Sequence, residues 1–155
     1  MYLQEYTNSF ETLTNRYVLS EEQLYFTGTP KECIELSNVD KERHSILAIN
    51  DDKLVTFFVL HEKNGVSPYS DNKNAILLRA FSTDFRYQGK GYAKKSLLLL
   101  PDFSRKNYKN IDEIILAVNK KNIIAQSLYA NCGFIDKGIR KMGKKGELTI
   151  MHYPL

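Results

Sequence analysis

The stretch from Arg86 to Lys95 reads R-Y-Q-G-K-G-Y-A-K-K. An apolar run, Ala75 to Phe81, precedes it, and four leucines, Leu97 to Leu100, follow it. A strand that passes through glycines into a helix presents the unpaired N–H groups of the first helical turn, where the helix dipole favours negative charge. Gly89 and Gly91 carry no side chain that could block a phosphate, and four basic residues surround them. The stretch therefore predicts a site for a phosphorylated ligand.

Two common nucleotide motifs do not match this loop. The sequence G-K-G-Y differs from the P-loop pattern G-x-x-x-x-G-K-[ST], so a P-loop nucleotide site is disfavoured. The dinucleotide pattern G-x-G-x-x-G also fails, because no glycine follows Gly91 at the required spacing. A glycine pair alone is also compatible with an ordinary left-handed turn, so the ligand has to be inferred from the rest of the chain.

The composition is that of one globular domain spanning residues 1–155. The chain is 43% hydrophobic and 26% charged, with a net charge of +4, too small an excess to imply nucleic acid. No apolar run approaches the ~20 residues of a membrane helix, and the N-terminus lacks the features of a signal peptide. Cys33 and Cys132 lie far apart without metal-ligand spacing. We therefore expect a cytoplasmic protein with free thiols and no metal, membrane or nucleic-acid partner.

The order of the expected elements indicates a mixed α/β fold. Apolar spacing at Phe10, Leu13 and Tyr17 predicts a helix, Ser20 can cap a second, and Pro30 can open a third through Leu36. The expected strands are residues 45–50, 54–62, 74–83, 111–118, 134–140 and 147–153, and the later helices are 92–106 and 122–131. Pro101 should kink or interrupt the first of these helices, and Gly133 should end the second.

Two motifs, one after the other along a strand–helix–strand–helix segment, resemble those of the GCN5-related N-acetyltransferase (GNAT) superfamily. Q-G-K-G-Y-A, residues 88–93, fits the signature Q/R-x-x-G-x-G/A. Further along, N-x-x-A-x-x-L-Y-x-x-x-G-F is similar to the second acetyl-coenzyme A motif of the family. Its positions here are Asn122, Ala125, Leu128, Tyr129, Gly133 and Phe134. The resemblance covers Ile46 to about Tyr153.

The resemblance implies a single-domain GNAT-like fold, with a mixed central sheet splayed around a coenzyme A cleft and flanked by helices. The sheet would split between the strand ending near Thr83 and the strand ending at Val118. The pantetheine arm would bind the open strand like an added strand, and the pyrophosphate would rest on the glycine loop. By this resemblance the residues that bind acetyl-CoA, the co-substrate, are Phe81, Thr83, Gln88, Gly89, Lys90, Gly91, Tyr92, Ala93 and Asn122.

The same resemblance assigns Tyr129 as the general acid. Acetyl transfer to an amine needs a neutral amine, a donor to the developing oxyanion and a proton for the leaving thiolate. Tyr129 would point its hydroxyl toward the sulfur, and a backbone N–H near Thr83 would serve the oxyanion. The base stays open among His61, Glu62, Asp84 and water. No metal is expected.

The acceptor is a small amine, with its class left open. Acidic residues in the early helices, and Asp71 in the loop before the central strand, would suit a cationic amine. D-N-K-N, residues 71–74, together with R-Y-Q-G-K-G also looks like bacterial polyamine acetyltransferases of the superfamily. A polyamine is therefore one candidate, beside a peptide N-terminus and an amino sugar.

Two other classes of function remain compatible with the sequence. One is a non-catalytic acyl-coenzyme A-binding or sensing module on the same fold, because fold does not determine function. The other is a nucleic-acid-binding protein, which would show affinity that falls steeply with salt. A homodimer is also possible, with pairing through the C-terminal strand Glu147–Tyr153.

Overall fold

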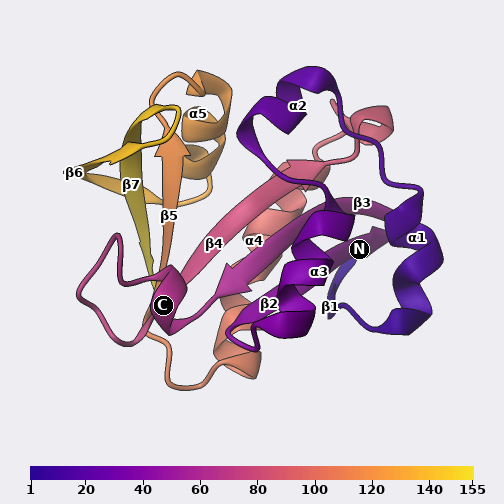
Figure 1. The fold of residues 1–155 in the computed structure, drawn as a ribbon, viewed down its shortest axis with the longest axis horizontal. Coiled ribbons are helices and arrows are strands. Elements are labelled where there is room, and N and C mark those ends of the chain that lie inside the picture. Colours follow the sequence, from indigo (N-terminus) through magenta and orange to yellow (C-terminus); the bar gives the residue numbers. More distant parts are fainter.

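Seven strands and five α-helices make up the computed structural model, which describes residues 1–155. The strands are β1 (Tyr2–Glu5), β2 (Arg43–Asn50), β3 (Lys53–His61), β4 (Ala75–Thr83), β5 (Glu113–Asn119), β6 (Ile135–Gly143) and β7 (Gly146–Pro154). The α-helices are α1 (Glu11–Asn15), α2 (Glu21–Phe26), α3 (Pro30–Val39), α4 (Tyr92–Asn107) and α5 (Ile123–Asn131). Short 3-10 turns are η1 (Asn8–Phe10), η2 (Lys63–Gly65) and η3 (Phe85–Tyr87). All strands form one sheet in the order β1-β2-β3-β4-β5-β7-β6 (Figure 1).

The central strands β4 and β5 pair over only part of their length. They run parallel, and their pairing extends from Ala75 and Glu113 to Leu78 and Leu116. Beyond that point β4 stays paired with β3 as far as Thr83, while β5 stays paired with β7. The two halves of the sheet therefore diverge, as the arrows of β4 and β5 show in Figure 1. The predicted mixed sheet, splayed between these two strands and flanked by helices, is confirmed.

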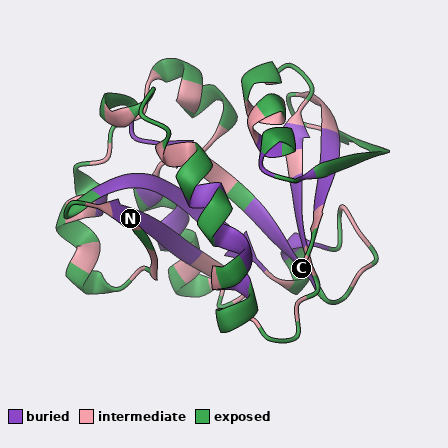
Figure 2. Ribbon diagram, turned by 180° about the vertical axis from the view of Figure 1, so that it is seen from behind, coloured by how far each residue is buried: buried purple, intermediate pink, exposed green.

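Side chains alternate along each strand, so the sheet has two apolar faces. Different helices cover these two faces. On one face, α4 and α5 pack over a cluster of 14 buried residues that includes Phe58 and Leu116. On the other, α1 and α3 pack over a cluster of seven that includes Phe57 and Val59. Figure 2 shows the buried strands in purple between helices whose outer surfaces are exposed. We call these the α4/α5 face and the α1/α3 face.

The helix starts expected near Ser20 and Pro30 are confirmed, and local hydrogen bonds explain them. The Ser20 hydroxyl accepts the N–H of Gln23, and the Gln23 side chain accepts the N–H of Ser20, which is a capping box. Thr29 and Glu32 form the same arrangement at α3, where Pro30 occupies the first helical position. These caps satisfy N–H groups that the first turn of a helix leaves unpaired.

The sequence interpretation missed β1. Residues Tyr2–Glu5 form a four-residue edge strand that pairs antiparallel with β2, from Tyr2 and Ile49 to Glu5 and Ile46. The segment is too short for a clear alternation of apolar and polar residues. Its conformation depends on the backbone hydrogen bonds that the edge of β2 offers, and that edge exists only in the folded sheet.

Two further points differ from the expectations. Of the kink or interruption expected at Pro101, the interruption is wrong, because α4 continues to Asn107. Leu97 and Leu100 are buried beside the proline, and two such burials contribute roughly as much as the ~3 kcal/mol that an internal proline costs. The C-terminal strand β7 lies between β5 and β6 and has no free edge for a second copy. The edge strand on that side is β6, and a homodimer stays a prediction.

Candidate functional site

The glycine loop presents a row of free backbone donors. Gly89 and Gly91 have φ angles of +78° and +80°, and Gly91 caps the N-terminus of α4 in the left-handed conformation. The first backbone hydrogen bond of the helix is donated by Lys95 to the carbonyl of Gly91. The six N–H groups from Gly89 to Lys94 therefore donate to no group within the chain. Such a row, at the positive end of a 16-residue helix, favours an anion.

The space above the two glycines is open. A Cβ built on Gly89 or on Gly91 would meet no atom within 4 Å. These glycines are therefore not required by packing within the protein. They leave the backbone donors accessible, which suits the close approach of a phosphate.

Basic side chains surround the loop. The side chains of Lys53, Arg86 and Lys90 lie 5.8, 5.2 and 5.9 Å from the centre of the Tyr87 ring. Lys53 comes from the start of β3, so the turn between β2 and β3 joins the glycine loop only in the tertiary structure. The Tyr92 hydroxyl accepts a hydrogen bond of 3.3 Å from Asn50 of the same turn. The cations add long-range attraction for an anion at the free N–H groups.

Beyond its last pair with β5, β4 leaves backbone groups facing the splay. The N–H of Asp84 donates to the Val55 carbonyl, so the N–H and C=O of the preceding residue, Thr83, point away from β3. The Thr83 carbonyl accepts a hydrogen bond of 2.6 Å from the Gln23 side chain of α2, while its N–H faces the same open side. We call β4 residues 79–83 the open edge of β4.

A bulge interrupts this open edge. The register with β3 shifts between Phe57 and Val59, so that Ala80 and Phe81 stand opposite the single residue Phe58. Ala80 has a φ of +54°, a strained conformation for a residue with a Cβ. Such bulges redirect side chains and backbone donors, and they are common beside functional sites.

Tyr129 reaches the open edge from α5. Its ring packs edge-on against Phe81 of β4, with centroids 5.9 Å apart, and against Phe134 at 5.8 Å. The residue is 8% exposed, and burial raises the pKa of its hydroxyl above the usual value. A phenol of this kind stays protonated at neutral pH and is able to donate a proton. The tertiary structure thus places the second sequence motif beside the strand that precedes the first.

Asn122 has a structural partner of its own. Its side-chain oxygen accepts the N–H of Ala125 at 3.2 Å and caps α5. Ile123 and Ile124, the next two residues, are 71% and 82% exposed. Helix α5 ends at Asn131, and Gly133 follows it with a φ of +98°, which confirms the expected stop.

Each of the three side chains considered as the base already has a partner within the chain. The fully buried Asp84 carboxylate accepts hydrogen bonds from Arg86 and from the N–H of Val18. Burial alone would raise the pKa of Asp84, but these hydrogen bonds outweigh it and keep the pKa below the usual value. Glu62 receives a hydrogen bond of 2.7 Å from His44. His61 has the Arg79 guanidinium as its partner, with Nδ1 3.2 Å from Nη1.

Sequence reasoning missed a tether between the segment before α2 and the end of β4. The Tyr17 hydroxyl donates to the Ser82 carbonyl at 2.6 Å, and the Phe85 N–H donates to the Val18 carbonyl at 2.8 Å. Gln23 of α2 binds Thr83, as described above. The S-x-x-Q capping box at Ser20 was the one local signal of α2, and nothing local indicated its contact with β4.

The tip of the β6–β7 hairpin contacts α2 from the other half of the sheet. The Lys145 ammonium lies 4.6 Å from the centre of the Tyr25 ring and donates to the Tyr25 carbonyl. Helix α2 is therefore bonded both to β4 and to the hairpin. It spans the two halves of the sheet where β4 and β5 have separated (Figure 1).

Comparisons with known proteins agree on one family. The Acetyltransferase (GNAT) family profile matches residues 5–134. An uncharacterized N-acetyltransferase of Bacillus subtilis, YbbJ, is 42% identical over 138 residues, which cover 88% of this chain and 86% of that protein. The spermine/spermidine N(1)-acetyltransferase of the same organism is 34% identical over 122 residues, 75% of each chain.

The fold agrees as well. The aminoglycoside acetyltransferase AAC(6')-Ib, in a crystal structure with coenzyme A, superposes with a TM-score of 0.78 at 13% identity, covering 98% of this chain and 93% of that one. No helix of the structure is long and apolar enough to cross a membrane. The resemblance seen in the two motifs, and with it an acetyltransferase enzyme, is confirmed. The chain belongs to the GNAT family of N-acetyltransferases.

Proposed function

We propose that residues 1–155 form one domain that transfers the acetyl group of acetyl-CoA to a primary amine of a small molecule. The observation that carries this proposal is the row of six unbonded N–H groups from Gly89 to Lys94, surrounded by cations and open to solvent. This arrangement suits a pyrophosphate, which coenzyme A carries. The relative AAC(6')-Ib, of the same fold, was crystallised with coenzyme A.

The residues that would hold acetyl-CoA follow from this arrangement. Within the predicted loop from Gln88 to Ala93, the N–H groups from Gly89 onward would bind the pyrophosphate, with Lys90 adding charge. The Gln88 N–H already donates to the Phe85 carbonyl. Thr83 has an N–H on the open edge of β4, and its carbonyl retains a second lone pair beside the Gln23 hydrogen bond. Together with Phe81, these groups suit an arm that binds in an extended form, like an added strand. The capping Asn122 side chain keeps its amide N–H groups available for the same arm.

Acetyl-CoA supplies an activated acetyl group on a thioester, and the chain supplies the proton. Tyr129 is our proposed general acid, because its hydroxyl stays protonated and its ring contacts Phe81 at the open edge. It would give its proton to the thiolate as the carbon–sulfur bond breaks. Another free backbone N–H of the open edge of β4 would donate to the negative charge that develops on the acetyl oxygen. Since Asp84 and Glu62 are engaged, water is the simplest acceptor of the proton that the amine loses.

The acceptor is a small amine. A relative at 34% identity is named for spermine and spermidine, so a polyamine is one candidate for this chain. A peptide N-terminus and an amino sugar are others, and all carry a primary amine that can be neutral when it attacks.

Calorimetric titration of the purified protein tests the cofactor half of this proposal. We expect micromolar binding of acetyl-CoA and no comparable binding of NAD or ATP. Absence of acetyl-CoA binding would contradict the proposed role of the glycine loop. A release assay for the free thiol of coenzyme A, run with a panel of amines, then tests the transfer itself.

A further inference from the structure

Arg79, on β4, carries a charge that no acidic group neutralises. Four other arginines each pair with an aspartate: Arg43 with Asp40, Arg86 with Asp84, Arg105 with Asp102 and Arg140 with Asp136. Arg79 forms no such ion pair. Burial, and then the neighbouring charge of Arg43, lower the pKa of its guanidinium. An exposed guanidinium without an acidic partner keeps donors available for a ligand.

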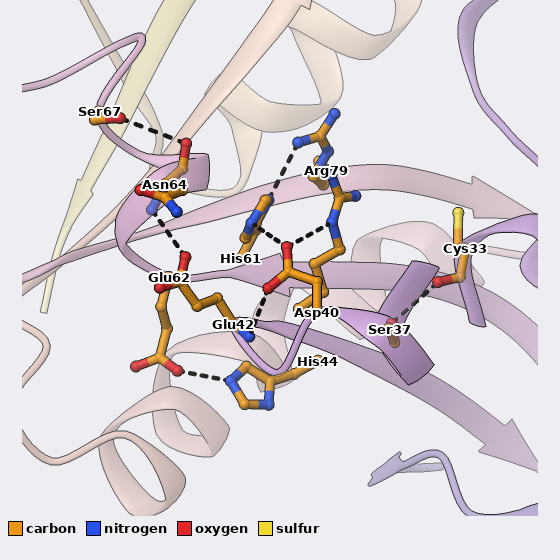
Figure 3. Close-up of polar contacts among 11 residues, drawn as sticks. Cys33, Ser37, Asp40, Glu42, His44, His61, Glu62, Asn64, Ser67 and Arg79 are labelled. Carbon is orange, nitrogen blue, oxygen red and sulfur yellow. Dashed lines mark hydrogen bonds and ion pairs between the residues drawn. The ribbon is translucent and has the colours of Figure 1, made fainter. Parts of the chain in front are cut away.

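The side chain that does contact Arg79 is a neutral histidine. The Arg79 Nη1 lies 3.2 Å from the His61 Nδ1. Figure 3 shows the two side chains joined by a dashed line. A guanidinium only donates, so Nδ1 offers its lone pair and the His61 proton resides on Nε2. That Nε2 faces the Asp40 carboxylate at 3.5 Å. His61 therefore orients Arg79 without neutralising it.

The same proton placement argues against a metal ion in this cluster. Asp40, Glu42 and His61 each bring one ligand atom within 4.8 Å of the others. A metal would need the lone pair of Nε2, which requires the proton on Nδ1, opposite the donor Arg79. The two guanidinium groups nearby add repulsion for any cation. The cluster is therefore a poor metal site.

Arg79 is well placed to meet an acceptor. It is the first residue of β4 after the last pair with β5, and it stands opposite Val59, a member of the α1/α3-face cluster. Phe81, on the other face, contacts Tyr129. Arg79 itself is exposed on the α1/α3 face.

The spacing suits a compact acceptor. Two residues of a strand cover about 7 Å, so Arg79 and the backbone of Phe81 are within the span of a small molecule. An amine whose carboxylate lies a few bonds away could present its nitrogen at the open edge while the carboxylate pairs with Arg79. A guanidinium binds a carboxylate through two parallel hydrogen bonds, and it repels a polycation.

We infer that Arg79 binds a carboxylate of the acetyl acceptor, so that the acceptor is an amino acid or a short peptide rather than a polyamine. This inference rests on the proposed function, namely transfer from acetyl-CoA to a small amine. His61 acts as a positioning residue for the guanidinium. The carboxylate contact determines specificity and leaves acetyl-CoA binding unchanged.

Matched pairs of acceptors test the inference. Thiol release is measured with glycine, β-alanine and L-lysine, with the amide of each, and with spermidine. In the unchanged protein, kcat/KM should be about 10-fold to 100-fold higher for the acid of the preferred pair than for its amide, the value of one charge-assisted contact. Arg79→Gln should remove that preference and Arg79→Lys should keep part of it. Arg105→Gln, an exposed arginine on α4, is the matched control and should change nothing.

A binding measurement tests whether Arg79 binds a carboxylate even if no turnover is observed. The same amino acids are titrated into the complex with coenzyme A while the NMR signal of the Arg79 Nε–H is followed. A saturable shift with an acid, absent with its amide, supports the inference. Equal use of acids and amides, preference for spermidine, a preference that survives Arg79→Gln, or no shift with any acid would overturn it. Loss of acetyl-CoA binding itself would instead refute the proposed function.

Discussion

Asp84 and Arg86 form a two-point ion pair at the end of β4, with Nε 3.1 Å from Oδ1 and Nη2 2.8 Å from Oδ2. The Asp84 carboxylate also accepts the N–H of Val18, and Arg86 donates to the carbonyl of Arg16. One buried carboxylate thus joins the glycine loop to the segment before α2. The Asp84 carboxylate thus holds both the glycine loop, which would bind the cofactor, and the segment before α2.

Asp84→Asn should therefore destabilise the protein. An amide keeps the shape of the side chain but loses the charge. Its NH₂ group would replace an oxygen that accepts hydrogen bonds, and an NH₂ group can only donate. We expect a loss of about 2–4 kcal/mol in the free energy of unfolding, measured by urea denaturation. Asp102→Asn, which breaks the exposed pair with Arg105, should cost less than about 1 kcal/mol. Similar costs for the two variants would show that burial of Asp84 carries no special weight.

Gly91→Val should abolish acetyl-CoA binding. The branched side chain would occupy the space that the phosphate needs, although it meets no protein atom. The left-handed φ of +80° adds a stability cost of roughly 1–2 kcal/mol. Gly138→Val, at a φ of +88° in β6 and also without neighbours, should show the same cost and an unchanged dissociation constant. Normal affinity in a folded Gly91→Val protein would remove the loop from the site.

Tyr129→Phe should lower turnover by roughly 100-fold, the usual contribution of a general acid, with little change in acetyl-CoA affinity. The hydroxyl makes no hydrogen bond within the chain, so its loss should not weaken the fold. Tyr153→Phe, on β7 beside Phe134, is the matched control and should turn over normally. Steady-state kinetics and calorimetry separate the two effects. Equal turnover in the unchanged protein and both variants would show that Tyr129 is not the general acid.

Stability should fall with pH below about 6.5 because of His61. Burial, then the charges of Arg43 and Arg79, lower the pKa of His61, while Asp40 and Glu42 oppose the shift. Since the folded-state pKa lies below the unfolded value, the unfolded chain takes up a proton first as the pH falls. The free energy of unfolding is thus highest above about pH 7 and decreases through pH 6.5.

His61→Asn should flatten this part of the pH dependence, because its carbonyl can still accept from Arg79 without titrating. Urea denaturation of both proteins at about pH 7.5, 6.5 and 5.5 gives the comparison, in which the other two histidines cancel. An identical slope in the two proteins would show that His61 is not responsible.

Activity should not depend on a metal ion. The proposed transfer uses a tyrosine proton and backbone donors, and the cluster of Asp40, Glu42 and His61 holds its proton where a metal would bind. Turnover before and after dialysis against a chelator should be equal. Loss of activity that Zn²⁺ or Mg²⁺ restores would contradict this prediction.

The sequence by itself determined the elements whose signals are local. Gly89 and Gly91 predict the loop because few other residues adopt its backbone angles, and alternating or continuous apolar runs predict six of the seven strands. Ser20, Pro30 and Gly133 predict helix ends through hydrogen bonds within a few residues. The order of these elements, with two motifs, was sufficient for the family.

Only the tertiary structure decided which distant groups meet. The pairing of β1 with β2, the passage of α4 through Pro101 and the interior place of β7 all depend on burial and on partners elsewhere in the sheet. So do the contacts that define the site: Tyr129 on Phe81, Gln23 on Thr83, and Arg79 on His61 without an acidic partner. Each contact joins residues far apart in the sequence, so no single segment encodes it.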